Sequence, residues 1–497
     1  MAFKPSKYQR LIYTFIEKCH GNAVVNAVAG SGKSTTIVNA LRIIPSDKKV
    51  LFLAFNKSIV EELAQKVKDI TNVEVSTLHS LGCKACMRLL NCSVNEDKYK
   101  THFSEGMLSG VYQPNGDLSE SDYEEWKSNI RDLIDLGRVN LIKKRVELEA
   151  VAEKFELYLV DNELDMVMKI LRWGILNSRQ IDFTDMIYFP VIKNLRMNQY
   201  DWVFIDECQD LNACQRELFQ RCVKSDGGRW IAVGDERQAI YGFAGADTES
   251  YAKLKAIPNT ATLPLSICYR CDENIIRMAK PIVPQIEWRD GAESGVVNKS
   301  ASLKDVRDGD MVLCRLSAPL TSLCMKYLSE GIKAYIKGKK VGENLINIVK
   351  RTKKKDIKTM LETIDRDNQN LLERIAKKKK LSLDDARENS TYVAAVDKYN
   401  ALVTLSAGLK TSAALINRIF QIFSDADKSG ICLSTIHKSK GLEADRVFII
   451  CEDTLLFKPC MRIPWQAEQE YNLVYVAYTR AKHHLGFIQD FKYRPGE

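Results

Sequence analysis

The chain has 497 residues, 45% of them apolar and 28% charged, with a formal net charge of +9. That length is too great for one hydrophobic core and predicts two to four domains, and the mild positive charge is consistent with a polyanionic partner. The N-terminal MAFKPSKYQR contains no apolar signal region, and no window of about 18 uncharged apolar residues follows it. We therefore expect a soluble protein without a membrane partner, in the cytoplasm or, in a eukaryote, the nucleus.

Four apolar runs in the first half of the chain predict buried strands of a parallel sheet. These runs are residues 22–29, 50–55, 202–206 and 230–235. Helices are expected after the first two runs, at about 33–42 and 57–69. The carboxyl ends of parallel strands meet at one edge of a sheet, so residues 30–35, Asp206, Glu207 and Asp235 can converge there.

Two polar segments interrupt the strand–helix alternation. Residues 91–180 are rich in Asp, Glu and Lys and have helical periodicity, which predicts a helical insertion in the first lobe. Residues 337–424 carry the lysine runs KGKK, KRTKKK and AKKKK and predict a second helical insertion. These lysines indicate either a solvated helical face or a surface that contacts phosphates, and the sequence does not decide between the two.

A second strand–helix series is expected from residues 262–266 onward, with further strands at 311–315, 431–437 and 446–451. The sequence therefore predicts an α/β protein with two parallel-sheet lobes, each with a mostly helical inserted domain. The first lobe is expected at residues 1–90 and 181–261, with its insertion at 91–180. The second lobe is expected at residues 262–336 and 425–497, with its insertion at 337–424.

The chain has fourteen cysteines and no secretion signal, which indicates a reducing compartment and not a disulfide scaffold. Two C-x-x-C pairs, Cys83/Cys86 and Cys268/Cys271, could together hold zinc or an iron–sulfur cluster. The first pair falls on a predicted helix, and the second brackets a tyrosine and an arginine. We therefore expect no metal at these cysteines.

The run AVAGSGKST at residues 27–35 is a phosphate-binding loop with Ala27 in place of its first glycine. Backbone N–H groups of such a loop hold phosphates, Lys33 reaches the β- and γ-phosphates, and the Ser34 hydroxyl ligates Mg²⁺. Thr35 either caps the following helix or contacts the α-phosphate. The residues expected to contact ATP here are Ala29, Gly30, Ser31, Gly32, Lys33, Ser34 and Thr35.

The run VFIDECQD at residues 203–210 places a pair of carboxylates after a strand. Asp206 is expected to hold Mg²⁺, and Glu207 then remains to orient or deprotonate a water. The two motifs together predict a P-loop NTPase that hydrolyses ATP with Mg²⁺.

The motifs, in order and across both lobes, resemble the UvrD/Rep/PcrA-like branch of superfamily 1 helicases, whose lobes are RecA-like. The segments that carry the resemblance are SKYQR, AFNKSIVEEL, STLHS, DFTDMI, VGDERQAIYGFAGA, LSICYRC, TIHKSKGLE and YVAYTRA. AFNKSI is particularly similar to the F-box DNA helicase subgroup, although no F-box is apparent. The resemblance covers about two thirds of the chain and neither insertion.

The resemblance implies roles for further residues. At the nucleotide it implies adenine reading by Gln9, adenine stacking by Tyr269, ribose contact by Glu443, γ-phosphate contacts by Gln238 and Arg270, and an arginine finger at Arg480. At single-stranded DNA it implies contacts by Phe55, Asn56, His79, Tyr241, Phe243, Thr435 and His437. The active site would then be complete only when the two lobes close on ATP.

Two departures from the family pattern matter. The motif around Tyr241 usually has an arginine after its aromatic residue, whereas this chain has Ala244. One contact between DNA and the ATP site is therefore expected to be absent. The segment around Phe55 is also shorter than the usual form.

We expect an ATP-dependent DNA helicase that moves 3′→5′ on single-stranded DNA, unwinds duplex junctions, and serves replication, repair or recombination. One alternative is a translocase that strips proteins or recombination intermediates with little unwinding. A second is a nucleotide-switched DNA clamp, against which Glu207, Gln238 and Arg480 argue. The residues do not exclude RNA, because stacking and phosphate contacts do not read the sugar, and they do not identify protein partners.

Overall fold

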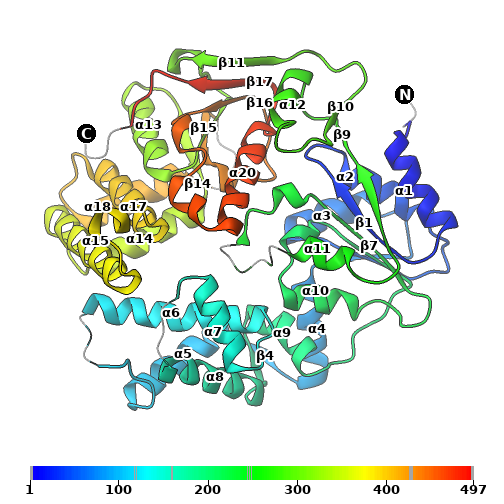
Figure 1. The fold of residues 1–497 in the computed structure, drawn as a ribbon, viewed down its shortest axis with the longest axis horizontal. Coiled ribbons are helices and arrows are strands. Elements are labelled where there is room, and N and C mark those ends of the chain that lie inside the picture. Colours follow the sequence, from blue (N-terminus) through cyan, green and yellow to red (C-terminus); the bar gives the residue numbers. More distant parts are fainter. Residues whose placement is uncertain are drawn as a thin grey trace. The chain divides into compact units, whose positions relative to one another are not determined.

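The computed structural model describes residues 4–493 except 117, 119, 158–160, 243, 244, 246, 248 and 425–428. The chain forms two compact units (Figure 1). Unit 1 comprises Met1–Val28 and Gly32–Ser266, and unit 2 comprises Ala29–Ser31 and Ile267–Glu497. Among the described helices, none combines the length and the apolar character needed to cross a membrane.

Unit 1 is built on a six-stranded, fully parallel sheet with strand order β3-β2-β6-β7-β1-β8. Its strands are β1 (Asn22–Ala27), β2 (Val50–Leu53), β3 (Val73–Ser76), β6 (Trp202–Ile205), β7 (Arg229–Gly234) and β8 (Thr260–Leu265). The helices associated with this sheet are α1 (Lys7–Lys18), α2 (Lys33–Leu41), α3 (Lys57–Lys66), α4 (Leu78–Leu90), α9 (Phe183–Ile192), α10 (Ala213–Gln220) and α11 (Ser250–Lys255). The four strands expected in this half of the chain are confirmed.

The inner strands β1, β2, β6 and β7 are mostly buried on both faces, which explains their apolar runs. Phe52 and Phe204 pack with residues of α1 and α2 in one core cluster, whereas Leu51 and Val203 pack with residues of α4 and α9 in another. Successive side chains of a strand point to opposite faces, so one run supplies both clusters.

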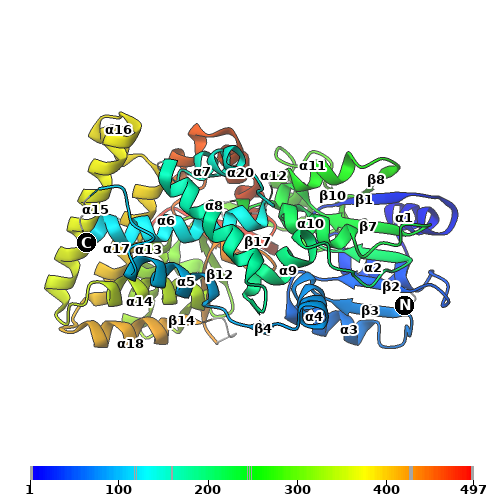
Figure 2. The same cartoon turned by 90° about the horizontal axis from the view of Figure 1, so that it is seen from below.

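In the described part of residues 91–182, unit 1 contains four helices beyond the sheet, grouped together in Figures 1 and 2. They are α5 (Lys98–Leu108), α6 (Glu120–Val139), α7 (Arg145–Lys154) and α8 (Asp161–Leu176). A two-stranded pair, β4 (Ser93–Val94) and β5 (Gln180–Ile181), lies at the ends of this segment.

A buried charge network attaches these helices to α9. The Lys98 Nζ atom lies 2.7 Å from Asp185 Oδ2, and Arg138 Nη1 lies 3.0 Å from Asp185 Oδ1 and 2.7 Å from Asp182 Oδ1. The side chains of Lys98, Arg138 and Asp185 are at most 1% exposed. Breaking one partner of such a network leaves a buried charge uncompensated, so these contacts hold the insertion firmly on the lobe.

Unit 2 is built on a seven-stranded parallel sheet with order β11-β17-β16-β12-β15-β13-β14. Its strands are β11 (Val296–Ala301), β12 (Met311–Cys314), β13 (Ala334–Lys337), β14 (Phe423–Ser424), β15 (Ile431–Thr435), β16 (Ala444–Ile449) and β17 (Ala481–Ile488). A separate parallel pair is formed by β9 (Ile267–Cys268) and β10 (Glu287–Trp288). The other helices of unit 2 are α12 (Glu273–Ala279), α13 (Ser317–Ser329), α19 (Ile436–Ser439) and α20 (Pro464–Tyr478).

Five consecutive helices lie between β13 and β14 and group together in Figure 1. They are α14 (Lys339–Arg351), α15 (Ile357–Lys379), α16 (Leu383–Arg387), α17 (Ser390–Ser406) and α18 (Ser412–Ile422). The predicted fold class is confirmed: the protein is α/β, with two RecA-like parallel-sheet lobes that each carry helical inserted segments.

One strand assignment is wrong. Residues 262–266 were expected to open the second lobe, but β8 pairs in parallel with β1, with Leu263 opposite Val25, and closes the sheet of unit 1. The division between the units falls after Ser266 and not after residue 261. The reason is physical: an apolar run predicts a buried strand but does not specify which sheet it joins.

Candidate nucleotide site

The phosphate loop connects β1 to α2 and depends on two glycines in the left-handed region. Gly30 has φ +67° and Gly32 has φ +75°, a conformation that other residues rarely adopt. Gly32 is the N-cap of α2, and no side chain caps this helix. The first backbone N–H groups of α2 therefore lie at a helix N-terminus that favours binding of an anion.

Lys33, the first residue of α2, contacts the acidic motif. Its Nζ atom lies 2.6 Å from Glu207 Oε1, and the two side chains are 16% and 21% exposed. Burial lowers the pKa of Lys33, but the carboxylates of Glu207, Asp206 and Asp235 outweigh that effect and raise the pKa above its usual value. Lys33 is therefore a fixed positive charge at the carboxyl ends of the strands.

The acidic motif begins directly after β6. Asp206 is 7% exposed and accepts a hydrogen bond of 2.9 Å from the Glu207 backbone N–H. Glu207 adopts φ +52°, a left-handed conformation that is uncommon for a residue with a side chain. Such backbone strain persists where surrounding contacts fix it, and it is typical of functional sites.

Gln238 lies after β7, at the neighbouring strand end. Its Nε2 atom donates a hydrogen bond of 2.8 Å to Asp235 Oδ2, and both residues are buried. The structure thus places Lys33, Asp206, Glu207, Asp235 and Gln238 at one edge of the sheet of unit 1, as parallel topology requires.

The remaining residues of the loop differ in burial. The Ser31 hydroxyl is buried and has no hydrogen-bond partner among the described residues, which leaves a polar group inside the loop for a ligand. Ser34 is half-buried in the first turn of α2. Thr35 is exposed and lies inside α2, so the expectation that it caps this helix is wrong.

The residue expected to read adenine is held by its own neighbours. Gln9 is 2% exposed, its Oε1 atom accepts the Ser6 backbone N–H at 2.9 Å, and its Nε2 atom donates to Thr36 Oγ1 at 3.0 Å. The Thr36 hydroxyl in turn donates to the Gly32 carbonyl. Gln9 is therefore tied to the first turn of α2.

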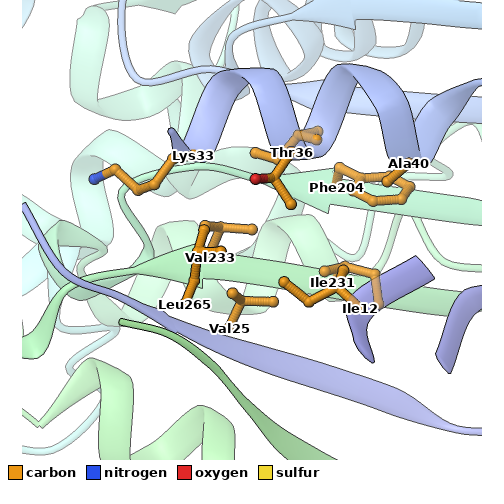
Figure 3. Close-up of a pocket in the computed structure, with 10 residues that line it drawn as sticks. Ile12, Val25, Lys33, Thr36, Ala40, Phe204, Ile231, Val233 and Leu265 are labelled. Atoms are coloured by element: carbon orange, nitrogen blue, oxygen red, sulfur yellow. The ribbon is translucent and has the colours of Figure 1, made fainter. Parts of the chain in front are cut away.

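A cavity of about 10 Å³ lies between α2 and the sheet (Figure 3). Its lining residues are Ile12, Val25, Lys33, Thr36, Ile37, Ala40, Phe204, Ile231, Val233 and Leu265. Figure 3 shows the Lys33 nitrogen extending away from the apolar side chains. The cavity is a gap of about one water in the core, too small for a nucleotide.

Two nucleic-acid candidates of unit 1 share a small cavity with the acidic motif. Phe55, His79 and Asp206 are among the residues that line this second cavity of about 10 Å³. Phe55 is 46% exposed, and burial lowers the pKa of His79. Asn56 caps α3 by accepting the Ile59 backbone N–H.

Two further candidates of unit 1 follow Gln238. Tyr241 is half-buried. Phe243 lies outside the described residues, as does Ala244.

In unit 2, Arg270 and Glu443 form an ion pair. Arg270 Nε lies 2.7 Å from Glu443 Oε2, and Arg270 Nη1 donates to the Thr479 carbonyl at 3.1 Å. The Arg270 and Lys482 charges oppose the effect of burial and hold the pKa of Glu443 below its usual value. Tyr269 is 42% exposed beside this pair.

Ala29 and Gly30 also belong to unit 2 by their contacts. The Ala29 backbone N–H donates to the Tyr475 hydroxyl at 2.8 Å, and the Gly30 carbonyl accepts the Tyr269 backbone N–H at 2.8 Å. A side chain at Gly30 would meet Arg270 Cβ at 2.6 Å, so the close approach requires glycine here.

Arg480 is buried, at 1% exposed. Its Nε and Nη1 atoms donate to the carbonyls of Val476 and Leu442, both at 2.9 Å, and its Nη2 atom donates to Thr479 Oγ1 at 3.2 Å. An arginine finger was expected at this position, and the structure shows a guanidinium bonded within its own unit.

The last two candidates flank the end of β15. Thr435 is half-buried and is the N-cap of α19. Burial lowers the pKa of His437 to about 3, and Arg315 and Lys438 act in the same direction. His437 is therefore neutral near pH 7.

Two family models match the chain. The UvrD/REP helicase N-terminal domain matches residues 12–258, and the UvrD-like helicase C-terminal domain matches residues 430–488. The chain belongs to the UvrD/Rep helicase family. The resemblance inferred from the motifs is thereby confirmed.

Curated relatives of this UvrD/Rep-type chain include three DNA helicases. The chain is 23% identical over 291 residues to the ATP-dependent DNA helicase PcrA of Bacillus subtilis, an alignment that covers 54% of the chain and 38% of that relative. It is 24% identical over 305 residues to the ATP-dependent DNA helicase Rep of Buchnera aphidicola, covering 56% and 42%. It is 24% identical over 373 residues to a probable DNA helicase II homolog of Mycoplasma genitalium, covering 70% and 52%. The chain spans about half the length of these relatives, or less.

Apart from the expected Mg²⁺ site, the described part of this helicase-family chain contains one candidate group of metal ligands. Among the described residues, Asp272, Glu293 and His483 form the one group of at least three that could hold an ion, and no cysteine belongs to such a group. Asp272 already accepts a hydrogen bond of 3.1 Å from Arg289 and is 2.8 Å from the His483 ring nitrogen. All fourteen cysteines are free thiols in the structure.

The sequence reasoning missed one residue that contacts the site. Gln209, in the middle of the acidic motif, is 2% exposed and hydrogen-bonds Glu207. The signal available was an amide inside an otherwise acidic and apolar segment, which is a polar group that must find a partner when buried.

Proposed function

We propose that the protein is an ATP-dependent DNA helicase that translocates 3′→5′ along single-stranded DNA and unwinds duplex junctions. The observation that carries the proposal is the contact of 2.6 Å between Lys33 and Glu207 at the end of the phosphate loop. A cation and a carboxylate that meet beside a glycine-rich helix N-terminus are suited to phosphoryl transfer, which needs charge neutralisation and a positioned water.

Each residue of this site has a specific proposed task. Lys33 neutralises charge on the β- and γ-phosphates, and Glu207 orients the attacking water and accepts its proton. Gln238 responds to the γ-phosphate, and Gln9 contacts the adenine. In unit 2, Tyr269 stacks on the base, Glu443 contacts the ribose, and Arg270 and Arg480 stabilise the charge of the transition state.

Magnesium fits the oxygen donors that the chain offers. Asp206 presents a buried carboxylate after β6, and Ser34 presents a hydroxyl in the first turn of α2. Carboxylates and hydroxyls are the ligands that Mg²⁺ takes in phosphate sites. When bound, Mg²⁺ would neutralise phosphate charge, while Lys33 remains the fixed cation of the chain.

The DNA is proposed to contact groups of both units. Phe55 is exposed and offers a stacking face in unit 1. The other candidates of this unit lie in its sequence motifs and are Asn56, His79, Tyr241 and Phe243. Thr435 and His437 are the corresponding candidates in unit 2. Stacking and phosphate contacts are sequence-tolerant, as a translocating enzyme requires.

Two alternatives remain as outcomes of the test. A translocase would hydrolyse ATP with DNA and displace bound proteins but separate strands poorly. A nucleotide-switched clamp would bind DNA in an ATP-dependent way without steady turnover.

The test measures ATP turnover with and without single-stranded DNA or RNA at two salt concentrations, together with displacement of a strand from a 3′-tailed and a 5′-tailed duplex. The proposal expects stimulation by DNA and unwinding of the 3′-tailed substrate alone. Glu207→Gln should retain ATP binding and lose turnover, because the amide cannot accept the proton of the water. Glu217→Gln is the matched control, since Glu217 forms a surface pair with Arg221. Unstimulated ATPase, or turnover retained by Glu207→Gln, would reject the proposal.

A further inference from the structure

Gln209 bridges two neighbouring strand ends of unit 1. It lies in the short turn of 3₁₀ helix Cys208–Asp210 after β6 and is 2% exposed. Its Nε2 atom donates to Glu207 Oε2 at 2.5 Å, and its Oε1 atom accepts the Asp235 backbone N–H at 3.0 Å. One buried side chain therefore links the acidic motif to the segment that follows β7.

The partners fix the orientation of the Gln209 amide. A carboxylate can only accept a hydrogen bond, so the group that faces Glu207 must be the NH₂. A backbone N–H can only donate, so the group that faces Asp235 must be the carbonyl oxygen. A flipped amide would lose both contacts.

Gln209 contacts the second oxygen of the Glu207 carboxylate. Oε1 of Glu207 is 2.6 Å from Lys33 Nζ, and Oε2 receives the Gln209 amide at 2.5 Å. With both oxygens engaged on different sides, the carboxylate group cannot rotate about its last bond without losing a contact. Its direction is therefore set by Gln209 as much as by Lys33.

On its other side, Gln209 contacts the segment that carries Gln238. Asp235, whose N–H binds Gln209, accepts the Gln238 side chain at Oδ2 and the Gln238 backbone N–H at its carbonyl. A continuous series of hydrogen bonds thus runs from Lys33 through Glu207, Gln209 and Asp235 to Gln238.

Gly234 supplies a second, independent observation. A Cβ atom at this position would lie 2.4 Å from Gln209 Oε1 and 2.7 Å from Cys208 Sγ. Gly234 lies in β7 and is not among the glycines with positive φ, so its backbone conformation does not require glycine. A larger residue here would remove the space taken by the Gln209 side chain and crowd the neighbouring Cys208 thiol.

We propose that Gln209 is a positioning residue for ATP hydrolysis, which aims the Glu207 carboxylate and couples it to the Asp235–Gln238 segment. The proposal rests on the proposed function, because it assumes that Glu207 handles the attacking water. Gln209 itself would touch neither ATP nor water. Loss of such an outer hydrogen bond commonly costs about 10- to 100-fold in activity.

The test is steady-state ATPase of the full chain with saturating single-stranded DNA. Gln209→Met keeps the volume and removes the hydrogen bonds to Glu207 and Asp235, together with a longer one of 3.4 Å to Asp210 Oδ2. We expect kcat to fall about 10- to 100-fold while KM for ATP changes less than about twofold. Gln209→Glu keeps the acceptor for Asp235 but replaces the donor to Glu207 with a carboxylate, and it should lose kcat as severely. Gln220→Met, which removes a side-chain bond at the end of α10, is the matched control and should retain both constants.

Two further variants address folding and coupling. Gly234→Ala displaces the Gln209 side chain without changing it and should also lower kcat at constant KM, so the proposal remains testable if Gln209→Met does not fold. Gln238→Ala combined with Gln209→Met should lose less than the product of the two single losses, because both changes break the same series of contacts.

The outcomes separate this proposal from the one on which it rests. If Glu207→Gln and Lys33→Ala retain turnover, the hydrolytic site itself is wrongly assigned. If those two variants lose turnover but Gln209→Met and Gln209→Glu keep the parent kcat, Gln209 is only a satisfied core amide and the inference is overturned. A rise in KM with unchanged kcat would also overturn it, because that result indicates uniform binding and not positioning of the carboxylate.

Discussion

Lys33 and Glu207, which are 174 positions apart in the chain, lie with Nζ and Oε1 separated by 2.6 Å. The phosphate loop follows β1 and the acidic motif follows β6 in the sheet of unit 1. Because the strands are parallel, both motifs lie at the same edge of the sheet. The raised pKa of Lys33 follows from this arrangement, because the neighbouring carboxylates stabilise the ammonium more than burial penalises it.

Lys33→Ala is expected to abolish ATP turnover while the variant remains folded. The substitution deletes the charge that would face the β- and γ-phosphates. Turnover is measured beside circular dichroism, and Lys66→Ala is the matched control because Lys66 forms a surface pair with Glu62 on α3. A folded Lys33→Ala variant with the parent rate would remove the nucleotide-site assignment.

Phe55→Ala should weaken binding of single-stranded DNA by about 1–3 kcal/mol, the usual value for one base stacked on an aromatic ring. Phe55 is 46% exposed at the end of the β2 segment and lines a cavity with Asp206. Fluorescence anisotropy with a labelled oligonucleotide measures the effect. Phe183→Ala provides the control, because Phe183 is an exposed phenylalanine of unit 1 for which no nucleic-acid contact is proposed. Equal, small losses for both variants would count against stacking on Phe55.

The strands and the nucleotide motifs could be predicted because they depend on local pattern. Buried parallel strands need continuous apolar runs, and the phosphate loop needs glycines at 30 and 32, where φ is positive. Both requirements are met by residues that are adjacent in the sequence. The carboxyl-end rule then places Asp206 and Asp235 near Lys33 without any knowledge of the packing.

What could not be predicted depends on tertiary partners. β8 has the same pattern whether it pairs with β1 or opens a second sheet, so the sequence assigned it to the wrong lobe. The sequence predicts a charged helical insertion before α9 but does not show that Arg138 and Lys98 are buried against Asp185. The contacts of Gln209 could not be predicted either, because its amide binds Glu207 and Asp235 only when the ends of β6 and β7 lie side by side.

Arg480→Ala is expected to slow ATP hydrolysis by about 10³-fold or more while single-strand affinity changes little, if the residue serves as an arginine finger. The burial of Arg480 adds a second expectation: its removal takes away hydrogen bonds to the Leu442 and Val476 carbonyls, so the thermal midpoint should also fall. Turnover and thermal unfolding are therefore measured together. Arg462→Ala, on the surface of unit 2, is the control. Parent-level turnover with a lowered midpoint would make Arg480 a structural residue.

His437 should make stability depend on pH in a defined window. Its pKa is lowered by burial to about 3 in the folded chain and is about 6.5 when unfolded. Below about pH 6.5 the unfolded chain binds a proton that the folded chain does not. The free energy of unfolding therefore decreases as the pH is lowered, by up to about 1.4 kcal/mol per pH unit. Between pH 7.5 and 5.5 the thermal midpoint of the parent should drop more than that of His437→Asn. His20→Asn, which changes an exposed histidine, controls for the substitution, and identical drops in parent and His437→Asn would contradict the expectation.

The lysine run at residues 377–380, at the end of α15, tests whether the second insertion contacts phosphates. Lys377 and Lys380 are exposed, and Lys380 ends the helix with φ +53°. If the run binds the phosphate backbone of DNA, replacing these four lysines with alanine should weaken single-strand binding for all sequences alike. The slope of log binding constant against log salt concentration should become less steep by about 0.7 per lost contact. Turnover at saturating DNA should persist, because no residue of this run has a proposed task at ATP. Four arginines at the same positions keep the charge and should keep the slope. A slope unchanged by the alanines would assign the run to a solvated helical face, since a contact that releases counterions cannot be removed without changing the salt dependence.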